Sequence, residues 1–209
     1  MIIRCWGSRG SIPVSGRLYQ RYGGNTTCLE IRTKDNNILI VDAGSGIREA
    51  GNALLAEGSL NFTLLLTHAH WDHIMGFPFF KPIYSSKIRM DIRGCPFAQT
   101  SIKKMLSRIM AAPNFPVNYS HIRAKIVYHE TCFKPVYRLG DMLITPIALS
   151  HPNGGTGYKF EEDGKTFIFL TDNELGHRHP GGLPFRQYLA FCRNADLLQL
   201  FEQPLDVFR

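Results

Sequence analysis

One segment constrains the sequence most: a largely apolar run at residues 62–67 leads directly into side chains that can bind metal ions. These side chains are His68, His70, Asp72 and His73. A short apolar run that ends in polar residues predicts a buried strand. Residues two apart in an extended segment point to the same side, so His68 and His70 can bind one ion together. Asp72 and His73 follow where the chain should turn into a helix, and they would face a neighbouring position.

The residue types in this segment narrow the choice of metal without fixing it. Imidazole nitrogens with carboxylate oxygens suit zinc, and they also suit iron or manganese. The alternative is a polar turn after a strand, with histidines exposed by chance. Four ligand-type side chains within six residues, at the end of a buried strand, favour the metal site.

Length and composition predict a single globular domain. The chain has 209 residues, of which 44% are hydrophobic and 20% charged, so we expect one domain over residues 1–209 and no disordered chain. It has no apolar run near the length of about 18 residues that a spanning helix needs, so no membrane partner is expected. The first residues, MIIRCWGSRG, lack the basic segment and apolar stretch of a signal peptide. We therefore expect a cytoplasmic protein.

The charge balance is basic. Lysine and arginine outnumber aspartate and glutamate by 24 to 17, which gives a formal net charge of +7. A basic surface is compatible with phosphates and nucleic acids as partners. Because the basic residues are scattered along the chain, an ordinary solvated surface is the alternative interpretation.

The cysteines form neither a disulfide framework nor a zinc-ribbon pattern. Their number is odd, they are widely spaced, and no CxxC pair occurs. We expect all of them to be reduced and mostly buried. They are Cys5, Cys28, Cys95, Cys132 and Cys192.

Many short strand-like runs, few helices and several turns predict two packed mixed sheets flanked by helices, an α/β arrangement. The turn residues at 34–36 and the EEDGK segment at 161–165 each indicate a hairpin. Expected strands cover 1–6, 26–33, 37–44, 62–67, 87–92, 124–129, 142–149, 157–161 and 166–171. Expected helices cover 46–58, 97–110 and 185–200, and the last nine residues are expected to be irregular.

The motifs together resemble the metallo-β-lactamase-fold hydrolases. HAHWDH at 68–73 matches the HxHxDH motif of that family in full, and VDAG at 41–44, SHP at 150–152 and TD at 171–172 extend the similarity over nearly the whole chain. The segments WGSRGS and YGGNTT resemble most the branch that contains phosphodiesterases and the tRNA 3′-end-processing endonuclease. The resemblance implies an αββα sandwich, here shortened at the C-terminus.

The resemblance also implies a dinuclear centre. Its first position would take His68, His70 and His151, and its second position would take Asp72 and His73, with Asp172 bridging both. Asp72 and Asp172 would be the catalytic carboxylates, and Asp42 would position ligands through hydrogen bonds. The alternative, purely structural roles are a surface turn for His151, a helix cap or turn for Asp172, and a turn at a strand end for Asp42.

The sequence departs from the family after residues 195–198, ADLL. Relatives normally continue into an HDA- or HEA-like motif and then a GHS-like motif whose histidine completes the second metal position, whereas the last histidine here is His179. We therefore expect a second position that lacks one protein ligand, and a sheet edge that is either exposed or covered by another subunit of a homo-oligomer. His177 and His179 are the nearest substitutes as ligands, with an exposed loop as their alternative.

By resemblance, the function would be hydrolysis of a phosphodiester by metal-bound hydroxide at two divalent ions, most simply zinc, with manganese or iron as alternatives. The substrate would be a small phosphodiester such as a cyclic nucleotide, or a nucleic-acid end. Two alternatives stay open. One is a non-catalytic or weakly active metal-binding or regulatory protein with an incomplete second position. The other is a different reaction of the fold, such as thioester or lactam hydrolysis or redox chemistry at a di-iron centre.

Overall fold

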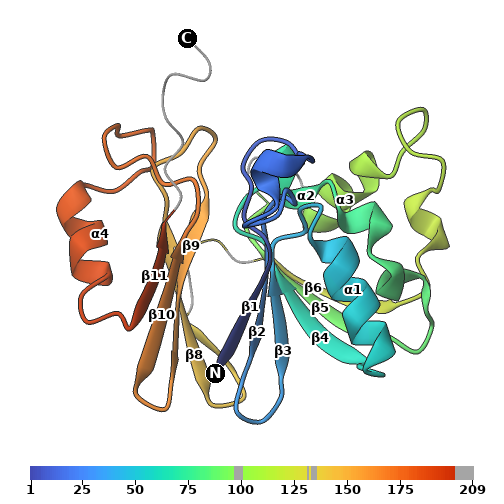
Figure 1. The fold of residues 1–209 in the computed structure, drawn as a ribbon, viewed down its shortest axis with the longest axis horizontal. Coiled ribbons are helices and arrows are strands. Elements are labelled where there is room, and N and C mark those ends of the chain that lie inside the picture. The colour runs from blue at the N-terminus through green and yellow to red at the C-terminus, as the bar shows by residue number, and fades with distance from the viewer. Residues whose placement is uncertain (97–100, 131, 133–135, 201–209) are drawn as a thin grey trace.

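The computed structural model describes residues 1–96, 101–130, 132 and 136–200, and it contains two face-to-face β-sheets with helices on their outer faces (Figure 1). The first sheet has six strands in the order β1-β2-β3-β4-β5-β6. They are β1 (Ile2–Gly7), β2 (Cys28–Arg32), β3 (Ile38–Val41), β4 (Asn61–Leu65), β5 (Arg89–Gly94) and β6 (Lys125–Glu130). Strands β1 to β3 pair antiparallel, and β3 to β6 pair parallel.

The second sheet has five strands in the order β11-β10-β9-β8-β7. They are β7 (Tyr137–Leu139), β8 (Met142–Ala148), β9 (Thr156–Glu162), β10 (Lys165–Leu170) and β11 (Leu197–Leu200). All neighbours pair antiparallel except β10 and β11, which pair parallel. Both sheets are therefore mixed, as the sequence predicts.

Helices cover the outer faces of the two sheets. Figure 1 shows α1 and α3 against the first sheet and α4 against the second. The helices are α1 (Ile47–Ala56), α2 (Trp71–Ile74), α3 (Ile102–Ile109) and α4 (Phe185–Phe191), with short 3₁₀ turns at Arg17–Tyr19, Phe77–Phe79, Lys81–Tyr84 and Tyr119–His121. Among the described residues, no helix has the length and apolar character needed to span a membrane.

Apolar side chains fill three layers. In β10, Phe167 and Phe169 pack between the sheets, whereas Ile168 and Leu170 pack outward against α4. Strand β3 alternates in the same way, with Leu39 in the layer between the sheets. Because both faces of these strands are covered, their sequences are continuously apolar rather than alternating. This layering confirms the predicted αββα sandwich.

One predicted element is wrong at its end. The helix expected over 185–200 stops at Phe191, and residues 197–200 form strand β11 instead. Asn194 adopts a left-handed conformation (φ 61°) that ends the helical path. The Asp196 carboxylate then accepts a hydrogen bond from the backbone N–H of Thr166 (2.8 Å), which aligns the following leucines beside β10. The short strand β7 was not expected, and residues 97–100 and 201–209 lie outside the described part of the chain.

The prediction that all five cysteines are reduced is also wrong. Cys95 and Cys132 form a disulfide, with their Cα atoms 4.5 Å apart. They follow β5 and β6, which are neighbouring parallel strands in register, so the two strand ends bring them together. Of the remaining cysteines, Cys28 is buried and Cys5 is exposed.

Candidate metal centre

The polar residues of interest lie where strands from both sheets end. Asp42 follows β3, the HAHWDH segment follows β4, His151 follows β8, and Asp172 follows β10. The backbone N–H of Thr156, at the start of β9, donates to the carbonyl of Thr67 (2.8 Å) and joins the two sheets at this edge. Loops that are distant in sequence are thereby brought to one place.

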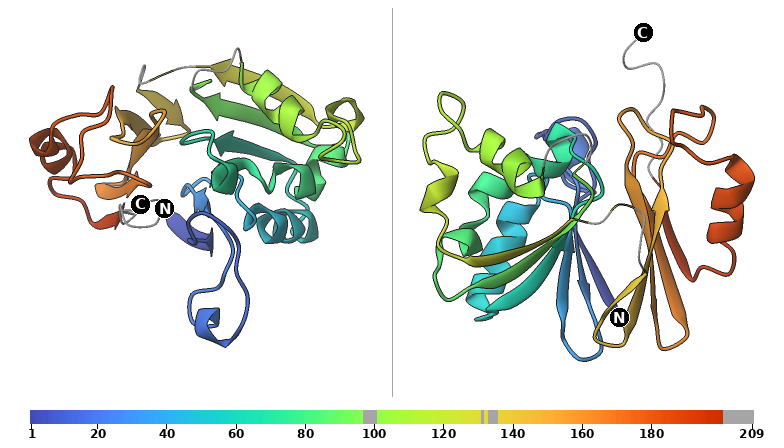
Figure 2. Two further views of the ribbon diagram at one scale, coloured as in Figure 1. Left: turned by 90° about the horizontal axis from the view of Figure 1, so that it is seen from above. Right: turned by 180° about the vertical axis from the view of Figure 1, so that it is seen from behind.

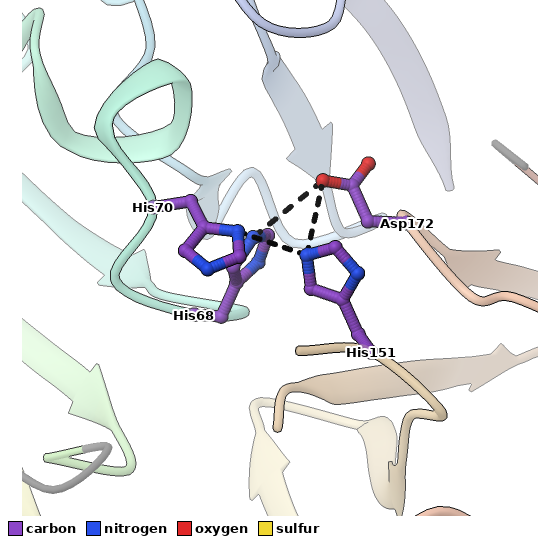
Figure 3. A group of neighbouring side chains, drawn as sticks. All are labelled: His68, His70, His151 and Asp172. Atoms are coloured by element: carbon purple, nitrogen blue, oxygen red, sulfur yellow. Dashed lines mark hydrogen bonds and ion pairs between the residues drawn. The ribbon is translucent and has the colours of Figure 1, made fainter. Parts of the chain in front are cut away.

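His68, His70, His151 and Asp172 point toward one another (Figure 3). One potential ligand atom from each of these four residues lies within 4.8 Å of all the others. Oδ2 of Asp172 is 3.5 Å from Nε2 of His68 and 3.8 Å from Nε2 of His151. The three histidines are those that the resemblance assigns to the first position, and Asp172 is the residue that it assigns as the bridge.

Asp72, His73 and Asp172 form a second group with the same spacing criterion. Nε2 of His73 lies 3.2 Å from Oδ2 of Asp172 and 3.7 Å from Oδ2 of Asp72. Asp172 is the member common to both groups. The two groups therefore have the arrangement of two adjacent metal positions that share one carboxylate.

The donors in the first group suit a divalent cation. Nε2 of His68 is buried and has no hydrogen-bond partner among the described residues. Nδ1 of His70 and Nε2 of His151 approach to 2.9 Å, and both face the same space as His68. An unpaired polar atom in the interior costs free energy, and a cation held by these nitrogens would remove that cost. A His/Asp cluster of this kind in this fold is suited to divalent metal binding.

Asp42 fixes the orientation of two of the histidines. Its carboxylate accepts hydrogen bonds from the backbone N–H (2.8 Å) and the hydroxyl (2.7 Å) of Thr67, and it lies 2.7 Å from Nδ1 of His73. The hydroxyl proton of Thr67 is thus used, so its oxygen can only accept from Nδ1 of His68, 3.1 Å away. Both histidines then carry a proton on Nδ1 and present Nε2 to the centre.

Burial and charge give the histidines different proton affinities. Burial lowers the pKa values of His68, His70 and His151, so their rings are neutral at neutral pH and can bind a metal. Burial also acts on His73, but the carboxylates of Asp42 and Asp172 outweigh it and raise the pKa of His73 to about 10. A metal ion at the second position must therefore displace a proton from this ring.

The N-terminal segment reaches the second group. The backbone N–H of Ser11 donates to Oδ2 of Asp72 (2.7 Å), so a loop far away in sequence orients this carboxylate. Figure 2 shows the segment between β1 and β2 extending away from the two sheets. Close packing beside the group requires glycine: a Cβ on Gly44 would lie 2.4 Å from the carbonyl oxygen of Asp72.

The proposed substitutes, His177 and His179, belong to neither group. The side chain of His177 is exposed, and that of His179 lies 2.8 Å from the carboxylate of Glu174. Glu174 is buried next to His151, and sequence reasoning missed it. Its only signal is its place two residues after Asp172 in TDNE, where turn residues are also common.

A family model described as the β-lactamase superfamily domain matches residues 36–199. The chain belongs to the β-lactamase superfamily. No curated protein matches its sequence. Among solved structures of this fold, the metallo-β-lactamase fold protein YhfI from Bacillus subtilis is similar, with 18% identity and a TM-score of 0.65 over 94% of this chain and 68% of that one.

Two further solved structures resemble this member of the superfamily. A diphosphatase of the PhnP family is 18% identical, with a TM-score of 0.64 over 94% of this chain and 72% of that one. The short form of human tRNase Z is 18% identical, with a TM-score of 0.62 over 94% of this chain and 76% of that one. These similarities confirm the predicted metallo-β-lactamase fold.

Proposed function

We propose that the protein is a metal-dependent phosphodiesterase with two divalent ions, in the first instance zinc. The observation that carries this proposal is the pair of ligand groups that share Asp172. Two ions held a few ångströms apart by a common carboxylate are typical of enzymes that hydrolyse phosphoryl and related esters.

The residues would divide between the two positions as the family resemblance implies. His68, His70 and His151 would hold the first ion, a three-histidine set that leaves a coordination position open and that zinc favours. Asp72 and His73 would hold the second, and Asp172 would contact both. Divalent ions bound there would lower the pKa of a water molecule between them and would offset negative charge on the phosphoryl oxygens.

The chain's own groups would orient the reactants. Asp72 and Asp172 are both buried, and each would accept a hydrogen bond from a water molecule directed at the phosphorus. The N–H of Ser11 donates to Oδ2 of Asp72 and would hold this carboxylate in its orientation. These are the roles that we assign to the two catalytic carboxylates.

Two lines of support point to a phosphodiester as substrate. Two of the similar solved structures are those of a diphosphatase of the PhnP family and of the short form of human tRNase Z. The net charge of +7 favours an anionic partner. We therefore place the chain in the phosphodiesterase and tRNA-processing branch, acting on a small phosphodiester or a nucleic-acid end.

One observation favours a second candidate function. Within the described residues, the second group offers only Asp72 and His73 besides the shared Asp172, whereas the first offers three histidines. This difference in the number of ligand residues would fit a protein that retains one ion and binds or senses a ligand without turnover.

The test is metal analysis combined with turnover of a chromogenic phosphodiester such as bis(4-nitrophenyl) phosphate. We expect close to two equivalents of metal per chain and hydrolysis that a chelator abolishes and added zinc restores. His151→Ala should lose metal and activity, whereas His177→Ala, which alters an exposed side chain, should keep both. One equivalent of metal without turnover would favour the binding protein. Wild-type metal content in both His68→Ala and His151→Ala would reject the assignment.

A further inference from the structure

A buried carboxylate connects the first ligand group to a histidine outside it. Glu174 lies in the loop after β10, and its side chain is largely buried. Oε1 of Glu174 is 3.3 Å from Nδ1 of His151, and Oε2 is 2.8 Å from Nε2 of His179. In Figure 3, one ring nitrogen of His151 faces His70 and Asp172, and the other points away from them. Glu174 therefore contacts the ring nitrogen of His151 that does not face His70.

The backbone around Glu174 is fastened to the strand end that carries His151. The N–H of Glu174 donates to the carbonyl of Ser150 (2.8 Å), and the N–H of Ser150 donates to the side chain of Asn173 (2.8 Å). The hydroxyl of Ser150 donates to the carbonyl of His177 (2.6 Å) and accepts from the N–H of His179 (3.0 Å). The loop and the strand end therefore form one hydrogen-bonded unit.

We propose that Glu174 is a positioning residue for His151, and that His179 in turn positions Glu174. An ionised carboxylate can only accept hydrogen bonds, so Nδ1 of His151 carries the proton and Nε2 presents its lone pair to the first metal position. A carboxylate behind a ligating imidazole also makes the ring a stronger ligand. This inference rests on the metal-dependent function proposed above.

The arrangement parallels the support of His73 by Asp42. In both cases a buried carboxylate lies on the side of the ring that faces away from the ligand group. The two supports differ in what holds the carboxylate. Thr67, at a strand end, donates two hydrogen bonds to Asp42, whereas Glu174 has the partly buried side chain of His179. Glu174 is not itself in either ligand group of the described residues.

The experiment compares Glu174→Gln and His179→Ala with the wild type in zinc titrations against a chromophoric chelator. Glutamine keeps one acceptor oxygen but places an amide N–H₂ against one of the two histidines. We expect Glu174→Gln to lower the affinity for one of the two zinc equivalents by about 10- to 100-fold and to leave the affinity for the other unchanged. His179→Ala should weaken the same equivalent by a smaller factor. With cobalt in place of zinc, the visible absorption of that equivalent alone should change.

His177→Ala is the matched control, because it removes a neighbouring exposed ring in the same loop while keeping the carbonyl that Ser150 uses. It should bind both equivalents as the wild type does. Wild-type affinity for both equivalents in Glu174→Gln and His179→Ala would overturn the proposal. Equal weakening of both equivalents would also overturn it, because that result indicates general damage to the fold. A wild-type protein that binds no zinc would instead reject the proposed function on which this inference rests.

Discussion

The two candidate metal positions share Asp172 but are built differently. The first takes His68 and His70 from the loop after β4 in one sheet and His151 from the loop after β8 in the other. The second takes Asp72 and His73 from a single helical turn, α2, which follows β4 of the first sheet. An ion at the first position would therefore join the two sheets, whereas an ion at the second would rest mainly on one of them.

This difference shows how a fold can form two sites of unequal origin. The second position depends on local geometry, because adjacent residues of α2 supply two ligands, and Asp42, which follows β3 of the first sheet, contacts one of them, His73. The first depends on the register between the sheets and on the loop that carries Glu174. Loss of the ion from the first position should therefore disturb the packing of the two sheets. Loss of the ion from the second position should disturb it less.

The largest expected effect is that of removing metal altogether. Chelation should lower the melting temperature, because an ion that binds only the folded chain stabilises it, by about 4 kcal/mol when free metal exceeds the Kd about a thousandfold. Differential scanning calorimetry with and without chelator measures the shift. In His151→Ala, which cannot join the sheets through the first ion, most of this difference should be lost. An unchanged melting temperature after complete metal removal from the wild type would contradict the model of an ion that joins the sheets.

Much of this comparison can be predicted from sequence, for a definite physical reason. HAHWDH places four ligand types within a few residues of one strand end, so local geometry brings them together. The resemblance assigns His151 and Asp172, and the structure places both beside the HAHWDH segment. In each case a polar residue follows the end of an apolar strand, and these strand ends from the two sheets meet at one place.

The features that sequence reasoning missed depend on long-range contacts. Glu174 is one of many polar loop residues until the fold brings it against His151. The sequence of β11 is compatible with the end of a helix. It forms a strand because the left-handed conformation of Asn194 ends the helix and because the following residues pair with β10. The pairing of Cys95 with Cys132 follows only from the register of β5 and β6. None of these contacts leaves a periodic pattern in the sequence.

Asp42→Asn should lower the metal affinity of the second position, whereas Glu174→Gln should lower that of the first. Asparagine keeps the size of the side chain but places an N–H₂ group or a neutral oxygen against Nδ1 of His73, which loses its charged partner. We expect the second metal equivalent to weaken by about 10- to 100-fold and the first to change less, through the contact of Thr67 with His68. Competition titration with zinc gives both constants. If the variant instead loses only the first equivalent, our assignment of Asp42 to the second position is wrong.

The two equivalents should also respond differently to pH. The first-position histidines have lowered pKa values and are already unprotonated at pH 8, so raising the pH further should leave that affinity unchanged. His73, with a pKa of about 10, is protonated at pH 8 and must release a proton when the second ion binds. Affinity for that ion should rise about tenfold per pH unit below pH 10. Calorimetric titration in buffers of different ionisation enthalpy counts the protons, and equal release by both ions would argue against the difference.

The smallest expected effect concerns the N-terminal contact with the second position. Ser11→Pro removes the N–H that donates to Asp72, and proline cannot adopt the positive φ of 70° found there. Asp72 would then rotate more freely, so the second equivalent should weaken several-fold while the first keeps its affinity. Ser11→Gly is the matched control, because glycine retains the N–H and accepts the positive φ without strain. If the two variants bind zinc alike, the loop between β1 and β2 does not orient Asp72, and the second position depends on α2, Asp42 and the shared Asp172 without it.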